Sequence, residues 1–375
     1  MSRTRSSAAT FLGLSLAASI LLSSCTTAPA SPSQSSSQQS ATPTSGHPSS
    51  GSQAPASGMG TPATISTGLG APWSVAFLND TPLVSERDSS RILEVASDGS
   101  TRAIGTVAGV EGAGEGGLLG IAVDGQGRLY AYSTAAGGNR IQRFAISGKP
   151  GALALGQAET ILEDIPSASN HNGGRLAFGP DGMLYATTGD AGQRTLAQDL
   201  GSLGGKILRM TPDGDVPQDN PFSGSLVYSY GHRNPQGLAW AADGTMFATE
   251  FGQNTWDELN IITAGANYGW PTVEGVATTD GFTDPVQQWK PDVASPSGMA
   301  QRDGMLYIAN LRGEVLRAVP VADPTTSTDY FVGEFGRLRD VTVAPNGPLW
   351  VLTNNTDGRG TPGAEDDRIL AFIPE

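Results

Sequence analysis

One of the three histidines in the chain lies in a setting suited to proton transfer. His171 belongs to the polar segment Ala-Ser-Asn-His-Asn-Gly-Gly-Arg-Leu, which leads into an apolar run. An imidazole on such a loop can accept a proton near neutral pH, so His171 is a candidate general base. The alternative is a hydrogen-bonded turn residue. His47 lies in a Ser/Pro-rich stretch and is expected to be inert.

The second candidate segment, Tyr-Gly-His-Arg-Asn-Pro-Gln-Gly, offers a cation. Its residues Arg233 and Asn234 directly precede Pro235, whose ring restricts the local backbone. A guanidinium held in this way suits a carboxylate or a phosphate, because its planar fork makes two parallel hydrogen bonds. A surface ion pair is the alternative.

Further arginines and a polar loop follow towards the C-terminus. Arg337 and Arg339 are two residues apart in an apparent strand, so they share one face. Arg312 lies in the turn Asn-Leu-Arg-Gly. Arginines near strand ends in an acidic protein indicate an anion pocket, with a solvated face as the alternative. The polar loop 250–258 carries oxygens that suit calcium, although its spacing is not that of an EF-hand.

Two kinds of short element repeat along the chain and must position these residues. The first is an Asp-Gly or Asn-Gly turn followed by alternating apolar residues, with two looser copies, at 79–84, 124–130, 179–185, 242–247, 302–307 and 345–350. The second is a short alternating strand at 91–95, 140–144, 206–210, 258–262, 314–317 and 368–372. Period-two alternation predicts β-strands, and the turn residues suit tight hairpins.

Six such paired units predict an all-β fold, a six-bladed β-propeller of four-stranded antiparallel blades. The alternatives are a β-sandwich, for which the strands are too many, and a solenoid, for which the repeats are too long. Ligands of propellers sit at one end of the central axis. The long inserts 190–203 and 265–296 are expected to build a site there.

The N-terminal part has a different character. Residues 1–24 combine Arg3 and Arg5 with an apolar stretch too short to span a bilayer, and they end directly before Cys25. This resembles a bacterial lipoprotein signal peptide, with an ordinary secretory signal as the alternative. Residues 25–62 then read as lipidated Cys25 and a disordered Ser/Pro-rich tether, and 63–375 as the propeller. The expected location is extracytoplasmic, with lipid on Cys25 holding the protein to the outer face of the bacterial cell membrane.

Composition excludes several classes of function. The formal net charge of −14 argues against nucleic acid as a partner, because phosphate binding needs a broad basic face. Cys25 is the only cysteine, so the folded part contains no disulfide. The sequence contains no His/Cys set for zinc, no Gly-rich loop for a dinucleotide and no serine in a nucleophile elbow.

Taken together, these segments resemble the soluble pyrroloquinoline-quinone (PQQ) aldose sugar dehydrogenases, the glucose/sorbosone dehydrogenase family. The resemblance runs from Gly70 to the C-terminus and rests on the segments 116–120, 171–176, 189–190, 231–237, 258–260, 267–271 and 337–341. It implies a six-bladed propeller with PQQ and Ca²⁺ as cofactors. It also implies oxidation of the anomeric hydroxyl of aldose sugars to lactones, with electrons passed to an external acceptor such as a quinone, a cytochrome or a dye.

The resemblance implies roles for individual residues. His171 matches the catalytic base and Asp190 the carboxylate that assists it. Glu115 stands where the glucose-oxidising branch has a glutamine near the sugar. The expected contacts to the cofactor are made by Arg233, Asn234, Arg312, Arg337 and Arg339. The expected calcium ligands are the backbone carbonyls of Gly252 and Gln253 at the active site, and Glu258 and Tyr268 at a second site.

Some positions depart from the family pattern. Phe251 replaces a frequent histidine, Gln253 replaces a common proline, and Asn170 replaces an acid sometimes seen before the base. These changes lie around the substrate and calcium, so they bear on the sugar preference more than on the cofactor class. Two other functions stay open: a calcium-dependent lactone hydrolase with His171 as its base, and a non-catalytic surface propeller that binds a sugar or a protein.

Overall fold

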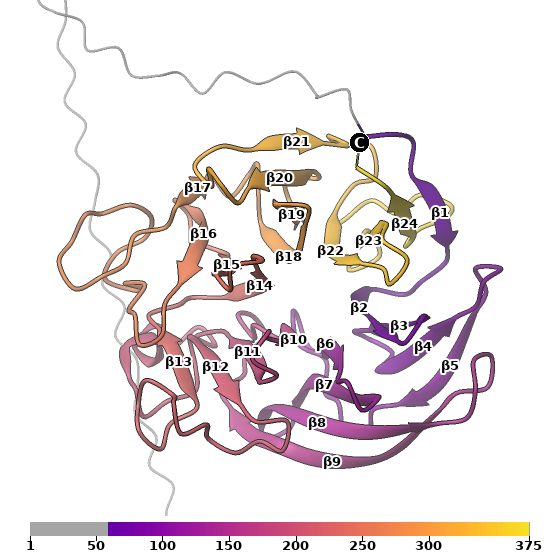
Figure 1. Cartoon of the computed structure of the whole chain (residues 1–375), viewed down its shortest axis with the longest axis horizontal. Helices are drawn as coiled ribbons and strands as arrows, with labels where there is room; N and C mark the ends of the chain where they lie inside the picture. The colour runs from indigo at the N-terminus through magenta and orange to yellow at the C-terminus, as the bar shows by residue number, and fades with distance from the viewer. Residues whose placement is uncertain (1–58, 375) are drawn as a thin grey trace, which may run out of the picture. The chain divides into compact units, whose positions relative to one another are not determined.

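The computed structural model describes residues 59–374. These residues form the propeller in Figure 1, in which six sheets surround a central axis. The predicted signal peptide, Cys25 and most of the predicted tether lie outside the described residues. No helix within 59–374 has the length and hydropathy needed to cross a bilayer.

Each sheet is a four-stranded antiparallel blade, so the predicted fold is confirmed. The first three blades are β2 (Pro72–Leu78), β3 (Thr81–Glu86), β4 (Arg91–Val95) and β5 (Thr101–Thr106); β6 (Leu118–Val123), β7 (Arg128–Ala135), β8 (Gly138–Ser147) and β9 (Ala154–Ile165); and β10 (Leu176–Phe178), β11 (Leu184–Thr188), β12 (Lys206–Met210) and β13 (Val227–Tyr230). One short 3₁₀ helix, η1 (Arg194–Gln198), lies between β11 and β12.

The next two blades follow the same order, and the last is completed by the first strand of the described residues. They are β14 (Pro235–Trp240), β15 (Met246–Glu250), β16 (Asp257–Ile262) and β17 (Gln287–Trp289); β18 (Pro296–Arg302), β19 (Met305–Asn310), β20 (Leu316–Pro320) and β21 (Thr328–Tyr330); and β22 (Leu338–Val343), β23 (Leu349–Thr353), β24 (Ile369–Phe372) and β1 (Ala63–Ser66). Outside these strands, Met59 forms an isolated bridge with Pro374.

The two repeated elements in the sequence correspond to fixed positions in every blade. The Asp-Gly and Asn-Gly turns join the first and second strands, and the second element is the third strand. Gly182, Gly244 and Gly347 in these turns all have positive φ angles of 75°, 91° and 104°. Glycine reaches this conformation without the steric penalty of a side chain, so the repeat marks a backbone requirement.

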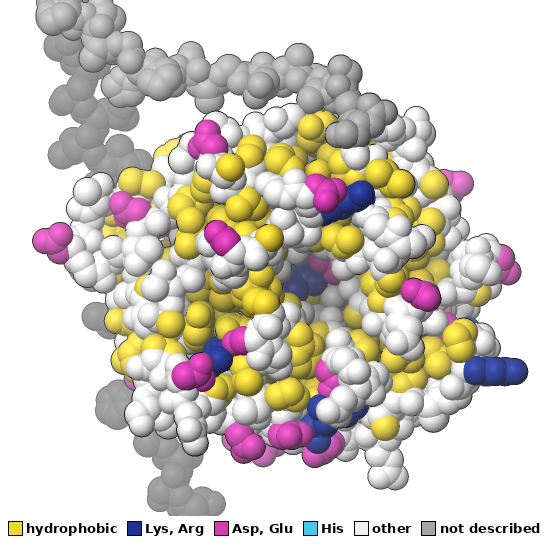
Figure 2. Space-filling view, in the orientation of Figure 1, with side chains coloured by type: hydrophobic (Ala, Val, Ile, Leu, Met, Phe, Trp, Pro, Cys, Tyr) yellow, Lys and Arg dark blue, Asp and Glu magenta, His cyan; other side chains and the backbone are white. Residues whose placement is uncertain are grey.

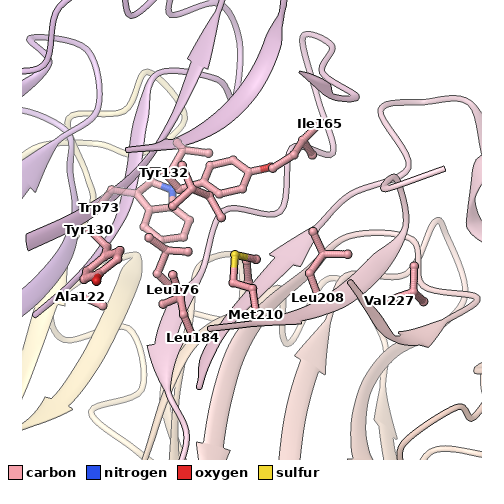
Figure 3. Packing of buried hydrophobic residues seen from close by; sticks show 13 residues of the cluster. Trp73, Ala122, Tyr130, Tyr132, Ile165, Leu176, Leu184, Leu208, Met210 and Val227 are labelled. Atoms are coloured by element: carbon pink, nitrogen blue, oxygen red, sulfur yellow. The ribbon is translucent and has the colours of Figure 1, made fainter. Parts of the chain in front are cut away.

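The hydrophobic core lies between neighbouring blades. In Figure 3, Trp73 of the first blade packs beside Tyr132 of the second and Leu176 of the third, all less than 5% exposed. Because blades pack face to face, a middle strand such as β11 is buried along its whole length. Only outer strands such as β9 are largely exposed.

The first strands of the blades line the axis (Figure 1). Figure 2 shows Lys or Arg side chains at the bottom of the central hollow, although the rest of that face is mostly apolar and uncharged. On one end of the axis, the blade-to-blade connections and the loops between second and third strands converge. These are the loops that carry the candidate residues.

Candidate active site

His171 and Asp190 come together at the third blade. His171 lies on the connection before β10, and Asp190 follows β11. The imidazole Nδ1 is 2.7 Å from Asp190 Oδ1. The close approach of the two loops depends on Gly189, because a Cβ there would lie 1.9 Å from the carbonyl oxygen of His171. His171 itself has a φ of 57°, an uncommon left-handed conformation that often marks functional positions.

The Asp190 carboxylate is fully buried and has a donor on both oxygens. Oδ1 accepts hydrogen bonds from His171 and the Gly192 backbone, and Oδ2 accepts one from Trp270 Nε1 at 2.8 Å. Burial alone would raise the pKa of Asp190, but these contacts, first among them the one with His171, bring its pKa below the usual value. Asp190 is therefore ionised at neutral pH and fixes the imidazole with Nε2 free for a reactant.

A pocket of about 300 Å³ opens beside this pair. Its lining includes His171, Asp190, Arg233, Gln253 and Trp270. Arg233 donates to the carbonyl of Phe251 and lies 5.6 Å over the ring of Trp270. The predicted base, carboxylate, arginine and calcium-loop residue therefore share one space, although they come from four separate segments of the chain.

The inserted loop 190–203 is held by a lysine that the sequence did not draw attention to. Lys206, at the start of β12, is fully buried. Its ammonium donates to the carbonyls of Leu196, Ala197 and Gly204 at 2.6–3.1 Å. Burial lowers the pKa of Lys206 to about 8. The loop that carries Asp190 is thus folded around a buried positive charge.

Three buried arginines form a second cluster at the hub. We call Arg87, Arg337 and Arg339 the arginine cluster; each is less than 9% exposed. Arg337 lies 3.2 Å and Arg339 3.8 Å from the Asp357 carboxylate, and Arg87 reaches the Asp357 carbonyl. Arg87 was missed from the sequence, because it follows a strand like many surface arginines. Arg87 also forms an ion pair with Asp88 at 2.6 Å, so three cations and two carboxylates leave one excess positive charge.

Arg339 is the most deeply buried of the cluster. Its guanidinium is held by the neutral side chains of Asn354, Gln236 and Ser297. Burial lowers the pKa of Arg339 to about 9. The one carboxylate that pairs with it, Asp357 at 3.8 Å, is shared with Arg337, so part of the charge of Arg339 stays available to an anionic ligand.

The Glu115 carboxylate lies beside the predicted base. It accepts a hydrogen bond from the backbone of His171 and lies 3.2 Å from Arg359. The residue predicted to face the sugar is therefore next to the predicted base.

Several buried donors at this end of the hub have no hydrogen-bond partner among the described residues. They are Arg233 Nε, Asn234 Nδ2, Arg337 Nε and Arg175 Nη2. Native proteins rarely leave buried donors unpaired, and each one left so costs about 1–3 kcal/mol. Such a set fits a bound ligand with several anionic oxygens, and a tricarboxylate such as PQQ has that chemistry.

The loop after β15 is wrapped around a carboxylate. Glu274 Oε1 accepts hydrogen bonds from four successive backbone amides, those of residues 253–256. No hydrogen bond between described residues engages the carbonyls of Gly252 or Gln253. These free oxygens fit calcium, which accepts backbone carbonyls as ligands. Glu274 lies in the insert 265–296 and was missed because nothing in its own motif points to the loop.

A pair of carboxylates lies deeper in the same blade. Glu258 stands opposite Glu250 across β15 and β16, and both are buried. Burial, together with the charge of Glu250, raises the pKa of Glu258 to about 8. The side-chain oxygen of Asn260 beside them has no partner within the described residues. This arrangement suits a cation, but no three His, Cys, Asp or Glu side chains in 59–374 group closely enough to hold one by themselves.

The remaining candidates do not enter the pocket. Tyr268 donates its hydroxyl to the carbonyl of Ile261 and stacks its ring on His232, so this hydroxyl is engaged within the protein. His232 is buried between Ser229 and Glu250, where it links strands. Arg312 is exposed on the loop between β19 and β20, and no ion pair within 59–374 engages it.

Comparison with known families identifies the class of protein to which this chain belongs. Residues 69–362 match the Glucose / Sorbosone dehydrogenase family, and the chain belongs to that family. The match covers the first five blades and strands β22 and β23 of the sixth, so the family resemblance predicted from the short segments is confirmed.

Individual relatives are close. The chain is 33% identical to the aldose sugar dehydrogenase YliI of Escherichia coli, over 76% of this chain and 88% of that protein. A PQQ-bound structure of an aldose sugar dehydrogenase from Streptomyces coelicolor is 50% identical, with a TM-score of 0.82 over 86% of this chain and 99% of that one. Quinoprotein glucose dehydrogenase B of Acinetobacter calcoaceticus is 33% identical over 53% of this chain and 49% of its own length.

Proposed function

We propose that this protein is a PQQ- and calcium-dependent dehydrogenase that oxidises the anomeric hydroxyl of aldose sugars to lactones. The observation that carries the proposal is the His171–Asp190 pair beside buried arginine and amide donors that lack partners. Three relatives support the same function: two are aldose sugar dehydrogenases, one of them in a PQQ-bound form, and the third is a quinoprotein glucose dehydrogenase.

His171 and Asp190 carry the proton chemistry in this proposal. Asp190 holds the imidazole in the tautomer with Nε2 unprotonated, and it stabilises the imidazolium that forms. His171 takes the proton of the anomeric hydroxyl at Nε2 as the C1–H bond breaks. The sugar loses two protons and two electrons in all and becomes the lactone. PQQ, when bound, would accept the two electrons together with the second proton, the hydrogen of the C1–H bond.

Other residues of the chain would bind and orient the cofactor, calcium and the sugar. Arg233, Asn234 and Arg337 would hold the cofactor through donors that have no partner in the described residues, and Arg87 and Arg339 would add positive charge. Gly252 and Gln253 would supply carbonyl ligands to calcium. The hydrogen bonds from the backbone of this loop to Glu274 hold the loop, and with it these carbonyls, in place. Glu115, anchored on the backbone of His171, lies where it can hydrogen-bond a sugar hydroxyl. Arg312 is exposed and would contact the cofactor only by reaching in from the rim.

Reconstitution tests the proposal directly. The purified apoprotein is titrated with PQQ in the presence of calcium, and fluorescence quenching reports uptake. An aldose panel is then offered with an artificial dye as the external acceptor. Saturable uptake of PQQ and sugar-dependent dye reduction are expected. Absence of PQQ uptake, or a His171→Ala variant with full turnover, would refute the proposal.

The same experiment separates the two other functions. A calcium-dependent lactone hydrolase would cleave gluconolactone without PQQ, and a binding module would do neither. The buried guanidinium donors without partners argue against the hydrolase, because a neutral lactone does not need several charged donors. The fixed His171–Asp190 pair argues against the binding module, because binding alone requires no oriented imidazole.

We also propose that lipid on Cys25 anchors the protein to the outer face of the cell membrane. The signal-like residues 1–24 and the position of the single cysteine support this. Membrane fractionation of cells expressing the full chain tests it. The wild type is expected in the membrane fraction, and Cys25→Ser is expected to be released from it.

A further inference from the structure

A cation at the mouth of the pocket has no role in the proposed mechanism. Arg194 opens η1, four residues after Asp190, and lines the same pocket as His171. Its guanidinium lies 5.3 Å from the ring centroid of Trp270. The indole in turn donates to Asp190, which holds His171. Arg194 is thus connected through a single aromatic ring to the base and its carboxylate.

The charge of Arg194 is not compensated by the protein. Its side chain is exposed, and no ion pair or side-chain hydrogen bond within residues 59–374 engages it. The acids nearby are already occupied: Asp190 by three donors, Glu115 by Arg359, and Glu274 by four amides. The pocket therefore presents a free guanidinium at its rim, one side chain away from the reaction centre.

We propose that Arg194 makes this site selective for acidic aldoses, which carry a carboxylate or phosphate at the end remote from the anomeric carbon. The inference rests on the proposed function. With the anomeric hydroxyl at His171, the far end of a sugar ring would extend along Trp270 towards Arg194. A guanidinium binds both carboxylate and phosphate through paired hydrogen bonds, so the two anions share one chemistry.

The expected effect is moderate, because Arg194 is exposed to solvent. Ion pairs in such positions are screened by salt and are weaker than buried ones. We expect an Arg194→Gln variant to lower the kcat/KM for an acidic aldose about five- to tenfold relative to an uncharged aldose of the same size. The preference of the wild type should also decrease as ionic strength rises.

The test compares matched substrates on the PQQ- and calcium-loaded protein. Glucuronate is compared with glucuronamide, which has the same size without the charge, and glucose 6-phosphate with glucose. These two pairs distinguish carboxylate from phosphate. Methyl glucuronoside, whose anomeric oxygen is blocked, gives a readout other than turnover. It should raise the Tm of the wild type and do so less in Arg194→Gln. Arg302→Gln, at a hairpin turn, is the matched control.

The outcomes are distinguishable. A loss of acid preference and of the glucuronoside Tm shift in Arg194→Gln, but not in Arg302→Gln, supports the inference, and Arg194→Lys should retain part of both. Equal kcat/KM for the charged and uncharged members of both pairs in the wild type overturns it. In that case normal PQQ uptake and glucose oxidation would leave the proposed function standing. Absence of PQQ uptake would remove both.

Discussion

The Asp190→Asn substitution tests the core of the reasoning, because an amide cannot replace this carboxylate. Asp190 presents acceptors on both sides, towards His171 and the Gly192 backbone on one and Trp270 on the other. Asparagine has one acceptor and one donor. If its oxygen stays towards His171, its NH₂ group faces the indole N–H of Trp270. If the amide flips, the NH₂ group faces His171 and favours the tautomer whose Nε2 carries the proton.

The magnitude follows from these contacts. Either orientation leaves a buried donor facing another donor, at about 1–3 kcal/mol, and also removes the charge that stabilises the imidazolium, worth about 1.5–3 kcal/mol. The sum of about 2.5–6 kcal/mol corresponds to a kcat lower by roughly 10²–10⁴, since each 1.36 kcal/mol is a factor of ten. PQQ affinity should be unchanged, because Asp190 is engaged by protein groups on every side.

The assay is dye reduction with a saturating aldose after PQQ uptake has been measured on the same sample. Trp270→Phe is the matched variant, because it removes the donor to Oδ2 but leaves the contact between Asp190 and His171. Loss of one hydrogen bond predicts a fall in kcat of about tenfold or less. The reasoning is refuted if Asp190→Asn retains kcat within threefold of the wild type, or if Trp270→Phe is equally damaging.

Four further predictions concern the elements around this pair. Arg339→Met should lower PQQ affinity at least 30-fold in fluorescence titrations, because it removes a buried cation of the arginine cluster; unchanged affinity would contradict this. Burial lowers the pKa of Lys206 from 10.5 to about 8, so the unfolded chain binds more protons between these values and stability should rise with pH there. Urea titrations at pH 7 and 10 should show this rise, up to about 3 kcal/mol, in the wild type but not in Lys206→Met. Because the pKa of Asp190 is lowered, its contribution to stability is present above the unfolded value of about 3.8 and is lost as pH falls further; acid titrations of Asp190→Asn should lack that loss. Calcium should raise the Tm of the wild type more than that of Glu258→Gln, and equal shifts would exclude a cation at the Glu250–Glu258 pair.

The fold was predictable because its signal is repeated and local. The Asp-Gly and Asn-Gly turns, such as Asp181-Gly182, require positive φ angles that few other residues tolerate; they join the first two strands of the last four blades, and looser copies do so in the first two. Alternating apolar residues then mark the strands that pack between blades. Each copy is weak evidence, but a six-fold repeat leaves few architectures that suit it.

The site was predictable only where a residue carries its own motif. His171, Arg233 and Arg339 lie in unusual polar segments, and the structure brings them to one end of the hub. Arg87 and Lys206 lie in ordinary strand contexts, and only the folded chain reveals that they are buried beside carbonyls and carboxylates. Contacts between distant segments have no signature in a single sequence.

Ring closure has a consequence for how the protein acquires activity during synthesis. The sixth blade needs β1 from the start of the propeller and β22–β24 from its end, so it can form only when nearly the whole chain has left the ribosome. Arg337 and Arg339 enter the hub with that last blade, and Arg87 comes from the first. A nascent chain with five blades therefore has a base but only part of its cation set. The chain can therefore bind a polyanion only late in synthesis, when β1 pairs with β24 and closes the ring of blades.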